Sequence, residues 1–305
     1  MSRIDEALRR AGVPLAEATS AGVGNADVFV SPWATGREAG PHEVPRIPAS
    51  HVEHHEEPKS EPVEREPAYG RVWQTRDLPS ACLERLALSS EADPLLAHQF
   101  RRLVATLLQA QGNGKLKTVM ITSAAPGDGK TLTALNLAFV LSESYRRRVL
   151  LIEADLRRPS ICATVGLPTK TQGLSDFVKA TDDRKASVLK LTELLTLMPA
   201  GRPDQDPLSG LTSVRLERLI QEASEQYDWV IIDTPPIGAA PDAGLIAPLA
   251  DAVLLVIRAG QTSYANAQQA VETLGADRIL GVVLNAVVPE VAARYDDYYG
   301  HYSRS

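Results

Sequence analysis

The sequence predicts an α/β fold with three layers and a mostly parallel central sheet. From residue 117 onward, short runs rich in Val, Ile and Leu alternate with longer segments whose apolar residues recur at helical spacing. Most of the short runs are continuously apolar, as expected for parallel strands that helices cover on both faces. A glycine-rich loop follows the first run and precedes a helical segment. With 305 residues and 44% hydrophobic content, the chain can build such a core.

The individual elements follow from this alternation. A helix is predicted from Pro94, which suits a first helical turn, to about Gln111. The expected strands are 117–122, 148–153, 194–198, 229–233, 252–257 and 279–284. Helices are expected between the strands, for example at 131–145, 213–226 and 264–274.

The N-terminal residues 1–13 form a short helix in the prediction, because Ile4, Ala7, Leu8 and Ala11 have helical spacing. Such a helix is too short to be stable alone. It therefore either docks to a partner or frays.

Residues 14–71 are rich in Pro, His, Glu and Gly and lack apolar periodicity, which predicts a disordered linker. Its cluster of His51, His54 and His55 is more typical of a solvated tract than of a metal site. The remaining parts are an edge segment that packs on the main domain (72–91), the main domain itself (92–288) and a flexible tail (289–305).

Composition limits the classes of function. The net charge of −6 and the absence of a long basic run argue against nucleic-acid binding. The two cysteines, Cys82 and Cys162, fit no metal-binding spacing and indicate free thiols in a reducing compartment. No apolar run approaches the ~20 residues that span a bilayer, and the N-terminus lacks the apolar core of a signal peptide. We therefore expect a cytoplasmic protein that reaches the inner face of the cell membrane through a partner.

Residues 124–131, Ala-Ala-Pro-Gly-Asp-Gly-Lys-Thr, predict a phosphate-binding loop between a strand and a helix. Its glycines let successive backbone N–H groups point at phosphate oxygens, and the following helix adds its dipole. Lys130 can reach the β- and γ-phosphates of ATP, and Thr131 can ligate Mg²⁺. The expected nucleotide-binding residues are Ala125, Pro126, Gly127, Asp128, Gly129, Lys130, Thr131 and Leu132.

Acidic residues end two of the predicted strands. Asp233 ends the strand at 229–233, where P-loop enzymes keep a second metal-orienting carboxylate. Glu153 ends another strand, and Asp155 follows two residues later on the same side. Three acids beside a phosphate-binding loop predict a site for metal binding and proton transfer.

The last eleven residues hold half of the eight tyrosines: Tyr295, Tyr298, Tyr299 and Tyr302. Polar residues lie between them, which opposes their burial as an aromatic patch against the domain. A nucleotide site combined with a mobile tail of clustered hydroxyls indicates a kinase that phosphorylates its own C-terminus.

These motifs together resemble the bacterial tyrosine kinases, which are P-loop autokinases of capsule and exopolysaccharide export. The resemblance covers about residues 92–305, and its most specific part is Leu-Leu-Ile-Glu-Ala-Asp-Leu-Arg-Arg-Pro at 150–159. The opening Ser-Arg-Ile-Asp-Glu-Ala-Leu at 2–8 is similar to the subgroup encoded with exosortase-associated exopolysaccharide clusters. The resemblance implies a P-loop NTPase fold, autophosphorylation of the tail by a neighbouring subunit, and regulation of polysaccharide polymerisation and export.

The resemblance also implies roles for the acidic residues. Asp155 and Asp233 would organise the metal and water, and Asp155 would accept the tyrosine proton. Glu153 stands where the family usually has Asp, so it keeps the carboxylate but reaches one methylene further. Arg157 occupies the family's Asp-x-Arg position. Asn285 takes the place of an adenine-reading Asn, although an Asn after a strand is also an ordinary turn residue.

One family motif is incomplete in this chain. Where family members carry Glu-x-x-Arg-x-x-Arg for ring assembly, the matching positions are His98, Arg101 and Val104, so only the first arginine is kept. The resemblance therefore implies a homo-oligomer without fixing the number of subunits.

The resemblance further implies a separate membrane activator of the polysaccharide co-polymerase type, whose cytoplasmic segment completes the nucleotide site, and a cognate tyrosine phosphatase. Two other functions stay open. A partitioning-type P-loop ATPase would carry a second lysine where this chain has Ala125. A nucleotide-binding regulatory scaffold would lack kinase activity.

Overall fold

The computed structural model describes residues 86, 94–112, 116–169, 171–182 and 185–287. The predicted N-terminal helix, the linker with its histidine cluster, nearly all of the edge segment, and the tyrosine-rich tail lie outside the described residues. All the elements below belong to the main domain.

The central sheet has seven strands in the order β3-β4-β2-β5-β1-β6-β7. Their bounds are β1 Thr118–Ser123, β2 Val149–Glu153, β3 Leu189–Lys190, β4 Leu195–Met198, β5 Trp229–Asp233, β6 Ala252–Arg258 and β7 Ile279–Asn285. Every neighbouring pair is parallel except β3 with β4. The prediction of a mostly parallel sheet is confirmed, and each of the six predicted strands forms within a residue or so of its expected bounds.

Helices connect the strands. They are α3 Pro94–Gln111, α4 Lys130–Phe139, η2 Val140–Ser144, α5 Ile161–Thr164, α6 Leu174–Val178, α7 Leu208–Leu211, α8 Val214–Gln226, α9 Asp242–Ile246, η3 Ala247–Leu249 and α10 Tyr264–Leu274. The helix predicted at 131–145 is α4 followed by a π-helical turn, η2. This turn admits an extra residue per turn where the helix ends against the core.

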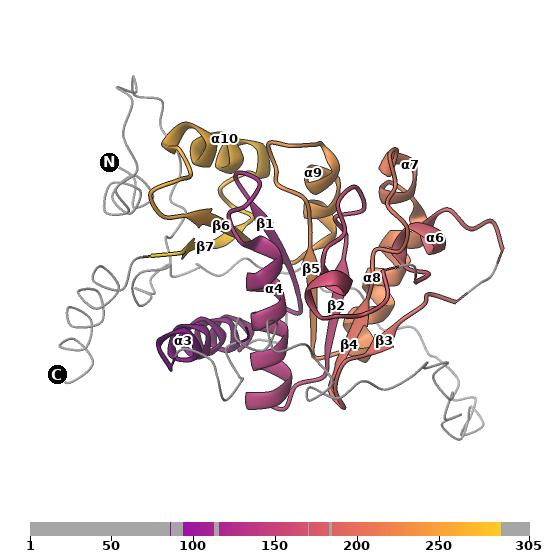
Figure 1. Cartoon of the computed structure of the whole chain (residues 1–305), viewed down its shortest axis with the longest axis horizontal. Coiled ribbons are helices and arrows are strands. Elements are labelled where there is room, and N and C mark those ends of the chain that lie inside the picture. Colours follow the sequence, from indigo (N-terminus) through magenta and orange to yellow (C-terminus); the bar gives the residue numbers. More distant parts are fainter. Residues whose placement is uncertain (1–85, 87–93, 113–115, 170, 183–184, 288–305) are drawn as a thin grey trace, which may run out of the picture. The chain divides into compact units, whose positions relative to one another are not determined.

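Two apolar clusters fill the space on either side of the sheet, which gives the three predicted layers (Figure 1). One face packs against α3, α4 and α5, and the other against α6 to α10. The side chains of β1 alternate between the two clusters, with Val119 and Ile121 on one side and Met120 on the other. This alternation within a continuous apolar run is the reason that such runs predict strands buried on both faces.

The register of the central strands brings the predicted acids together. Asp233 at the end of β5 lies opposite Ile121 of β1 on one side and Glu153 of β2 on the other. The carboxyl ends of these three strands therefore meet at one edge of the sheet, below the loop that leads into α4.

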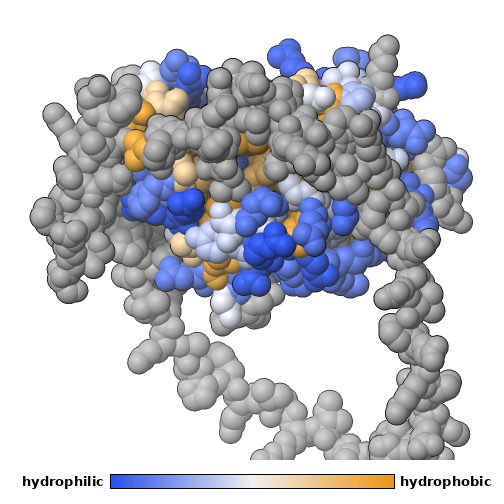
Figure 2. All heavy atoms as spheres, turned by 60° about the horizontal axis from the view of Figure 1, so that its bottom comes forward, coloured by the Kyte–Doolittle hydropathy of each residue, from blue (hydrophilic) through white to orange (hydrophobic). Residues whose placement is uncertain are grey.

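On the face that Figure 2 shows, hydrophilic residues predominate among the described ones. Figure 2 brings the lower side of Figure 1 forward and shows mostly hydrophilic residues with isolated apolar ones. Among the described residues, the large apolar side chains on the surface are Leu208 and Val214. None of the helices in the described ranges has the length and apolar character needed to cross a membrane.

A core substitution tests this packing. Leu151 is fully buried in the middle of β2, whereas Val214 is 68% exposed. Leu151→Ala is expected to lower the free energy of unfolding by about 2–5 kcal/mol, because it removes buried methyl groups and leaves a cavity. Val214→Ala, the matched surface change, should stay within about 0.5 kcal/mol of the wild type. Urea unfolding followed by circular dichroism measures both, and equal effects would contradict the assigned burial.

Candidate phosphate-binding loop and acidic cluster

The loop between β1 and α4 has the backbone that a phosphate site needs. Gly127 and Gly129 adopt φ angles of +86° and +97°, a region that other residues rarely enter. A side chain on Gly129 would also collide with the amide of Asn285. Because Gly129 offers no side-chain cap, the first N–H groups of α4 remain available for an anion.

Asp128 holds this loop from inside. Its side chain is buried, and its Oδ2 accepts a hydrogen bond from the backbone N–H of Ala125 at 2.8 Å. Its Oδ1 accepts from the Thr262 hydroxyl, also at 2.8 Å, and that hydroxyl accepts in turn from the backbone N–H of Arg258. The connection between β6 and α10 therefore braces the loop, a contact that the sequence motifs did not reveal.

Two further groups reach the loop from the same side. The Arg258 guanidinium donates to the carbonyl of Gly127 at 3.2 Å, and the Asn285 amide donates to the carbonyl of Asp128 at 2.8 Å. Asn285 thus lies beside the loop, where it supports the backbone. Its role in reading adenine stays a prediction. The other predicted loop residues, Pro126 at the exposed tip and the half-buried Ala125 and Leu132, flank this braced turn.

Lys130 joins the loop to two strand ends. Its ammonium group lies 2.9 Å from Asp155 Oδ2, 3.1 Å from Thr131 Oγ1 and 3.7 Å from Asp233 Oδ1. The Thr131 hydroxyl donates to Asp233 Oδ2 at 2.8 Å. Four of the predicted site residues therefore form one connected cluster at the carboxyl edge of the sheet.

Burial and charge act against each other in this cluster. Burial raises the pKa of Asp233 from 3.8 to about 7, against the opposing effects of Lys130 and Thr131. Burial alone would lower the pKa of Lys130, but the charges of Asp233 and Asp155 outweigh it and raise the pKa. The lysine therefore stays charged and is the main counter-ion for both acids.

The donor set of this cluster suits Mg²⁺ bound together with a nucleotide. Asp233 Oδ1 is buried and has no hydrogen-bond partner among the described residues. Across the same residues, no group of three or more His, Cys, Asp or Glu side chains forms a complete metal cage. Mg²⁺ prefers oxygen ligands and usually takes only one or two carboxylates beside substrate phosphates. Thr131, Asp155 and Asp233 are the residues that would hold it.

Glu153 is turned away from the cluster. Its Oε1 accepts from the backbone N–H groups of Ser160 and Ile161 at 2.5 and 2.6 Å, and its Oε2 accepts from Ala200 at 3.2 Å. Burial raises its pKa, although these three hydrogen bonds favour the charged form. The carboxylate therefore fixes the start of α5 and the segment after β4, which positions the loop that carries Asp155.

Arg157 also serves as a link between loops. Its guanidinium makes a bidentate ion pair with Asp242 of α9, with N–O distances of 2.7 and 3.1 Å, and donates to the carbonyl of Gln205 at 3.0 Å. Asp242 is only 1% exposed, so the arginine is the counter-ion for a buried charge. The structure places Arg157 beside the lysine cluster but outside it. Asp242 was not predicted, because no spacing motif connects it to Arg157.

Known proteins share this combination of motif and fold. The family model described as an AAA domain (AAA_31) matches residues 116–277. The tyrosine-protein kinase YwqD of Bacillus subtilis is 34% identical over 213 residues, which cover 69% of this chain and 89% of that protein. The tyrosine-protein kinase wzc of Salmonella typhimurium is 34% identical over 200 residues, 64% of this chain but 27% of the longer relative. The solved kinase domain of VpsO superposes with a TM-score of 0.56 at 32% identity, covering 64% of this chain and 96% of that domain.

The raised pKa of Asp233 predicts how stability depends on pH. Because the folded-state pKa lies above the ordinary value, the folded chain keeps a proton that the unfolded chain loses, and stability falls as pH rises from about 4 to 7. Asp233→Asn should therefore raise the thermal midpoint of the nucleotide-free protein more at pH 8 than at pH 5. Asp277→Asn, at an exposed position, should leave it unchanged at both. An equal effect of Asp233→Asn at both pH values would contradict the burial argument.

Proposed function

Because this chain belongs to the family of bacterial tyrosine-protein kinases, we propose that it transfers the γ-phosphoryl group of ATP to tyrosines near its own C-terminus. The observation that carries the proposal is the position of the Lys130 ammonium, inside a braced phosphate loop and between the carboxylates of Asp155 and Asp233. P-loop phosphoryl transfer uses a phosphate-binding loop, a lysine, a hydroxyl and acids that lie at or just beyond strand ends.

Each part has a defined task in this proposal. The loop N–H groups and Lys130 hold the phosphates of ATP and balance their charge. Thr131, Asp155 and Asp233 hold Mg²⁺, which would supply positive charge against the phosphate oxygens. Asp155, the more exposed of the two acids, accepts the proton of the tyrosine hydroxyl. The tyrosine oxygen bonds to the γ-phosphorus while the bond to the leaving ADP oxygen breaks.

The substrate in this proposal is the cluster Tyr295, Tyr298, Tyr299 and Tyr302, presented in trans by a second copy of the chain. Each phosphate adds about −1.5 to −2 charges beside Asp296 and Asp297. We therefore infer that the unphosphorylated chain assembles into an oligomer and that phosphorylation takes it apart. On helix α3, Arg101 is exposed and available for assembly, whereas Val104 is fully buried in the core.

Regulation of capsule or exopolysaccharide polymerisation and export follows as the biological role. A separate membrane activator would recruit the chain to the inner face of the membrane and complete the nucleotide site, and a cognate tyrosine phosphatase would reverse the reaction.

Mapping of phosphosites tests the proposed reaction. The full chain with Mg²⁺-ATP should acquire phosphate on the four tail tyrosines, and Lys130→Met should lower the rate by at least ~100-fold because it removes a donor to the transferred group. Lys190→Met, outside the site, is the matched control and should react as the wild type does. Mass spectrometry reads the sites, and gel filtration reads the oligomer before and after reaction.

Hydrolysis of ATP without phosphotyrosine, even with the cytoplasmic segment of the activator, would favour a partitioning-type ATPase or a regulatory scaffold. An oligomer of the same size before and after complete phosphorylation would contradict the assembly cycle alone.

A further inference from the structure

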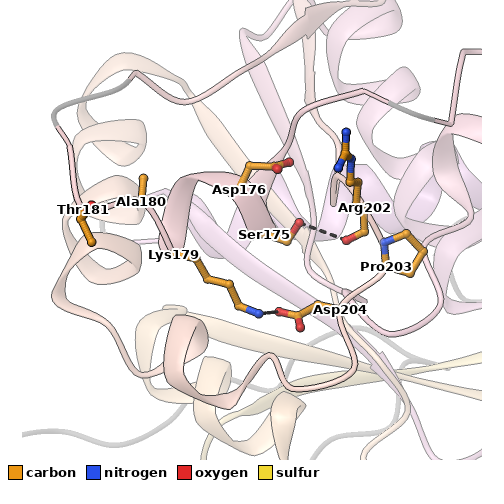
Figure 3. Close-up of a pocket in the computed structure, with 8 residues that line it drawn as sticks. All are labelled: Ser175, Asp176, Lys179, Ala180, Thr181, Arg202, Pro203 and Asp204. Carbon is orange, nitrogen blue, oxygen red and sulfur yellow. Dashed lines mark hydrogen bonds and ion pairs between the residues drawn. The ribbon is translucent and has the colours of Figure 1, made fainter.

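A polar groove lies on both sides of helix α6, at the carboxyl edge of the sheet. Its first hollow, of about 380 Å³, lies between the α6 region and the segment that follows β4 (Figure 3). The side chains around this hollow are Ser175, Asp176, Lys179, Ala180, Thr181, Arg202, Pro203 and Asp204. A second hollow of about 300 Å³ shares Asp176 with the first and includes Lys185 and Asp182. The two hollows therefore adjoin around one short helix.

The wall of this groove is bonded to the loop that carries Asp155. The backbone N–H of Asp204 donates to the carbonyl of Leu156 at 2.8 Å, and Arg157 donates to the carbonyl of Gln205 at 3.0 Å. Strand β4, which leads into the wall, pairs directly with β2. The wall of the groove therefore continues from the strand next to β2, whose end leads to Asp155.

The acids of the groove already have partners inside the protein. Asp176 Oδ2 accepts from the backbone N–H of Gly173 at 3.0 Å. Asp204 pairs with the Lys179 ammonium at 2.5 Å, and its Oδ1 accepts from the N–H of Asp206. Asp182 also has a partner. The carboxylates of Asp176 and Asp204 are therefore held by local contacts.

Three cations in the same region are free. Arg158, Lys185 and Arg202 are exposed, and the structure shows no hydrogen bond or ion pair from these three side chains to any described residue. Arg202 lines the first hollow and Lys185 lines the second. Arg158 lines neither hollow and lies in the loop after β2, three residues beyond Asp155. Asp206 is exposed on the same edge, but the three cations outnumber it, so the net available charge is positive and fits an acidic segment.

We propose that Arg158, Arg202 and Lys185 form a docking strip for the acidic residues beside the target tyrosine in the tail of a second copy. The occupant is the segment Tyr-Asp-Asp-Tyr-Tyr at 295–299, whose paired acids adjoin the tyrosines and which contains no lysine or arginine. The proposal rests on the proposed function and names how the substrate is recognised.

The topology favours a tail from another copy. The described residues end just after β7, which is the outermost strand on the side of the sheet away from β4. Five strand spacings separate these strands, on the order of 24 Å. Residue 295 lies only eight positions after the last described residue, so a tail from the same copy would have to be almost fully extended to reach the strip. A tail from a second copy has no such constraint.

A trans-phosphorylation assay tests the docking strip. The substrate is the full-length Lys130→Met chain, and the enzyme is the full-length chain with its four tail tyrosines changed to Phe, so that only the substrate accepts phosphate. In that enzyme, Arg202→Glu with Lys185→Glu should raise KM for the substrate about tenfold and leave kcat within about twofold, because exposed charge pairs contribute modestly to binding and these residues do not touch the reacting atoms. Arg146→Glu reverses an exposed charge near the amino-terminal end of β2, away from the strip. It should leave KM unchanged.

A charge swap separates docking from a structural effect. A substrate chain with Asp296→Lys and Asp297→Lys should have a raised KM with the enzyme that keeps the native strip. With the enzyme that carries Arg202→Glu and Lys185→Glu, its KM should return most of the way to the native value. An unchanged KM in the reversed enzyme, or no recovery in the swap, would overturn the docking strip while tyrosine phosphorylation itself persists. No phosphorylation of the substrate by the enzyme with the native strip would overturn the proposed function, and the docking strip with it.

Discussion

The ion pairs of Lys130 with Asp155 and Asp233 are the interaction on which the carboxyl edge of the sheet depends. Asp233 is fully buried at the end of a central strand, so its charge is costly unless a cation lies close by. Lys130 supplies that cation from the first turn of α4, and Asp155 shares it from the loop after β2. One ammonium group thereby ties the phosphate loop to two strand ends. The same ammonium must exchange partners when phosphates enter.

Around this centre, each loop is fixed by its own buried polar group. Asp128 braces the phosphate loop through its hydrogen bond with Thr262. Glu153 accepts hydrogen bonds from backbone N–H groups in the segments after β2 and β4. Asp242 forms an ion pair with Arg157. Because these groups have partners inside the protein, each of them fixes the position of the loop on which it lies. A site whose surroundings are fixed in this way is organised before the substrate arrives, which lowers the cost of ordering it during the reaction.

Sequence reasoning found the sheet and the cluster because both leave local signals. The continuous runs around Ile152 and Ile231 predict strands, and the spacing of Gly127, Gly129 and Lys130 predicts the loop. The two-residue strand β3 and the short helices α5 to α7 leave too little periodicity to be predicted. The partnerships of Asp128 with Thr262 and of Arg157 with Asp242 are set by tertiary contact alone. Strand alternation predicts that Glu153 and Asp155 share a side, but Asp155 lies beyond the end of β2, and the two carboxylates bind different partners.

We propose that Asp155 holds Lys130 in the nucleotide-free protein and, besides accepting the tyrosine proton, holds Mg²⁺ beside the nucleotide. Calorimetric titration of ADP with and without Mg²⁺, in the wild type and in Asp155→Asn, tests this most directly. Mg²⁺ should tighten ADP binding by the wild type about tenfold, or about 1.4 kcal/mol. Asp155→Asn should lose most of that gain and bind ADP without Mg²⁺ at least as tightly as the wild type, because Lys130 is released. If Mg²⁺ tightened ADP binding as much in Asp155→Asn as in the wild type, the proposed role of Asp155 in holding Mg²⁺ would be contradicted.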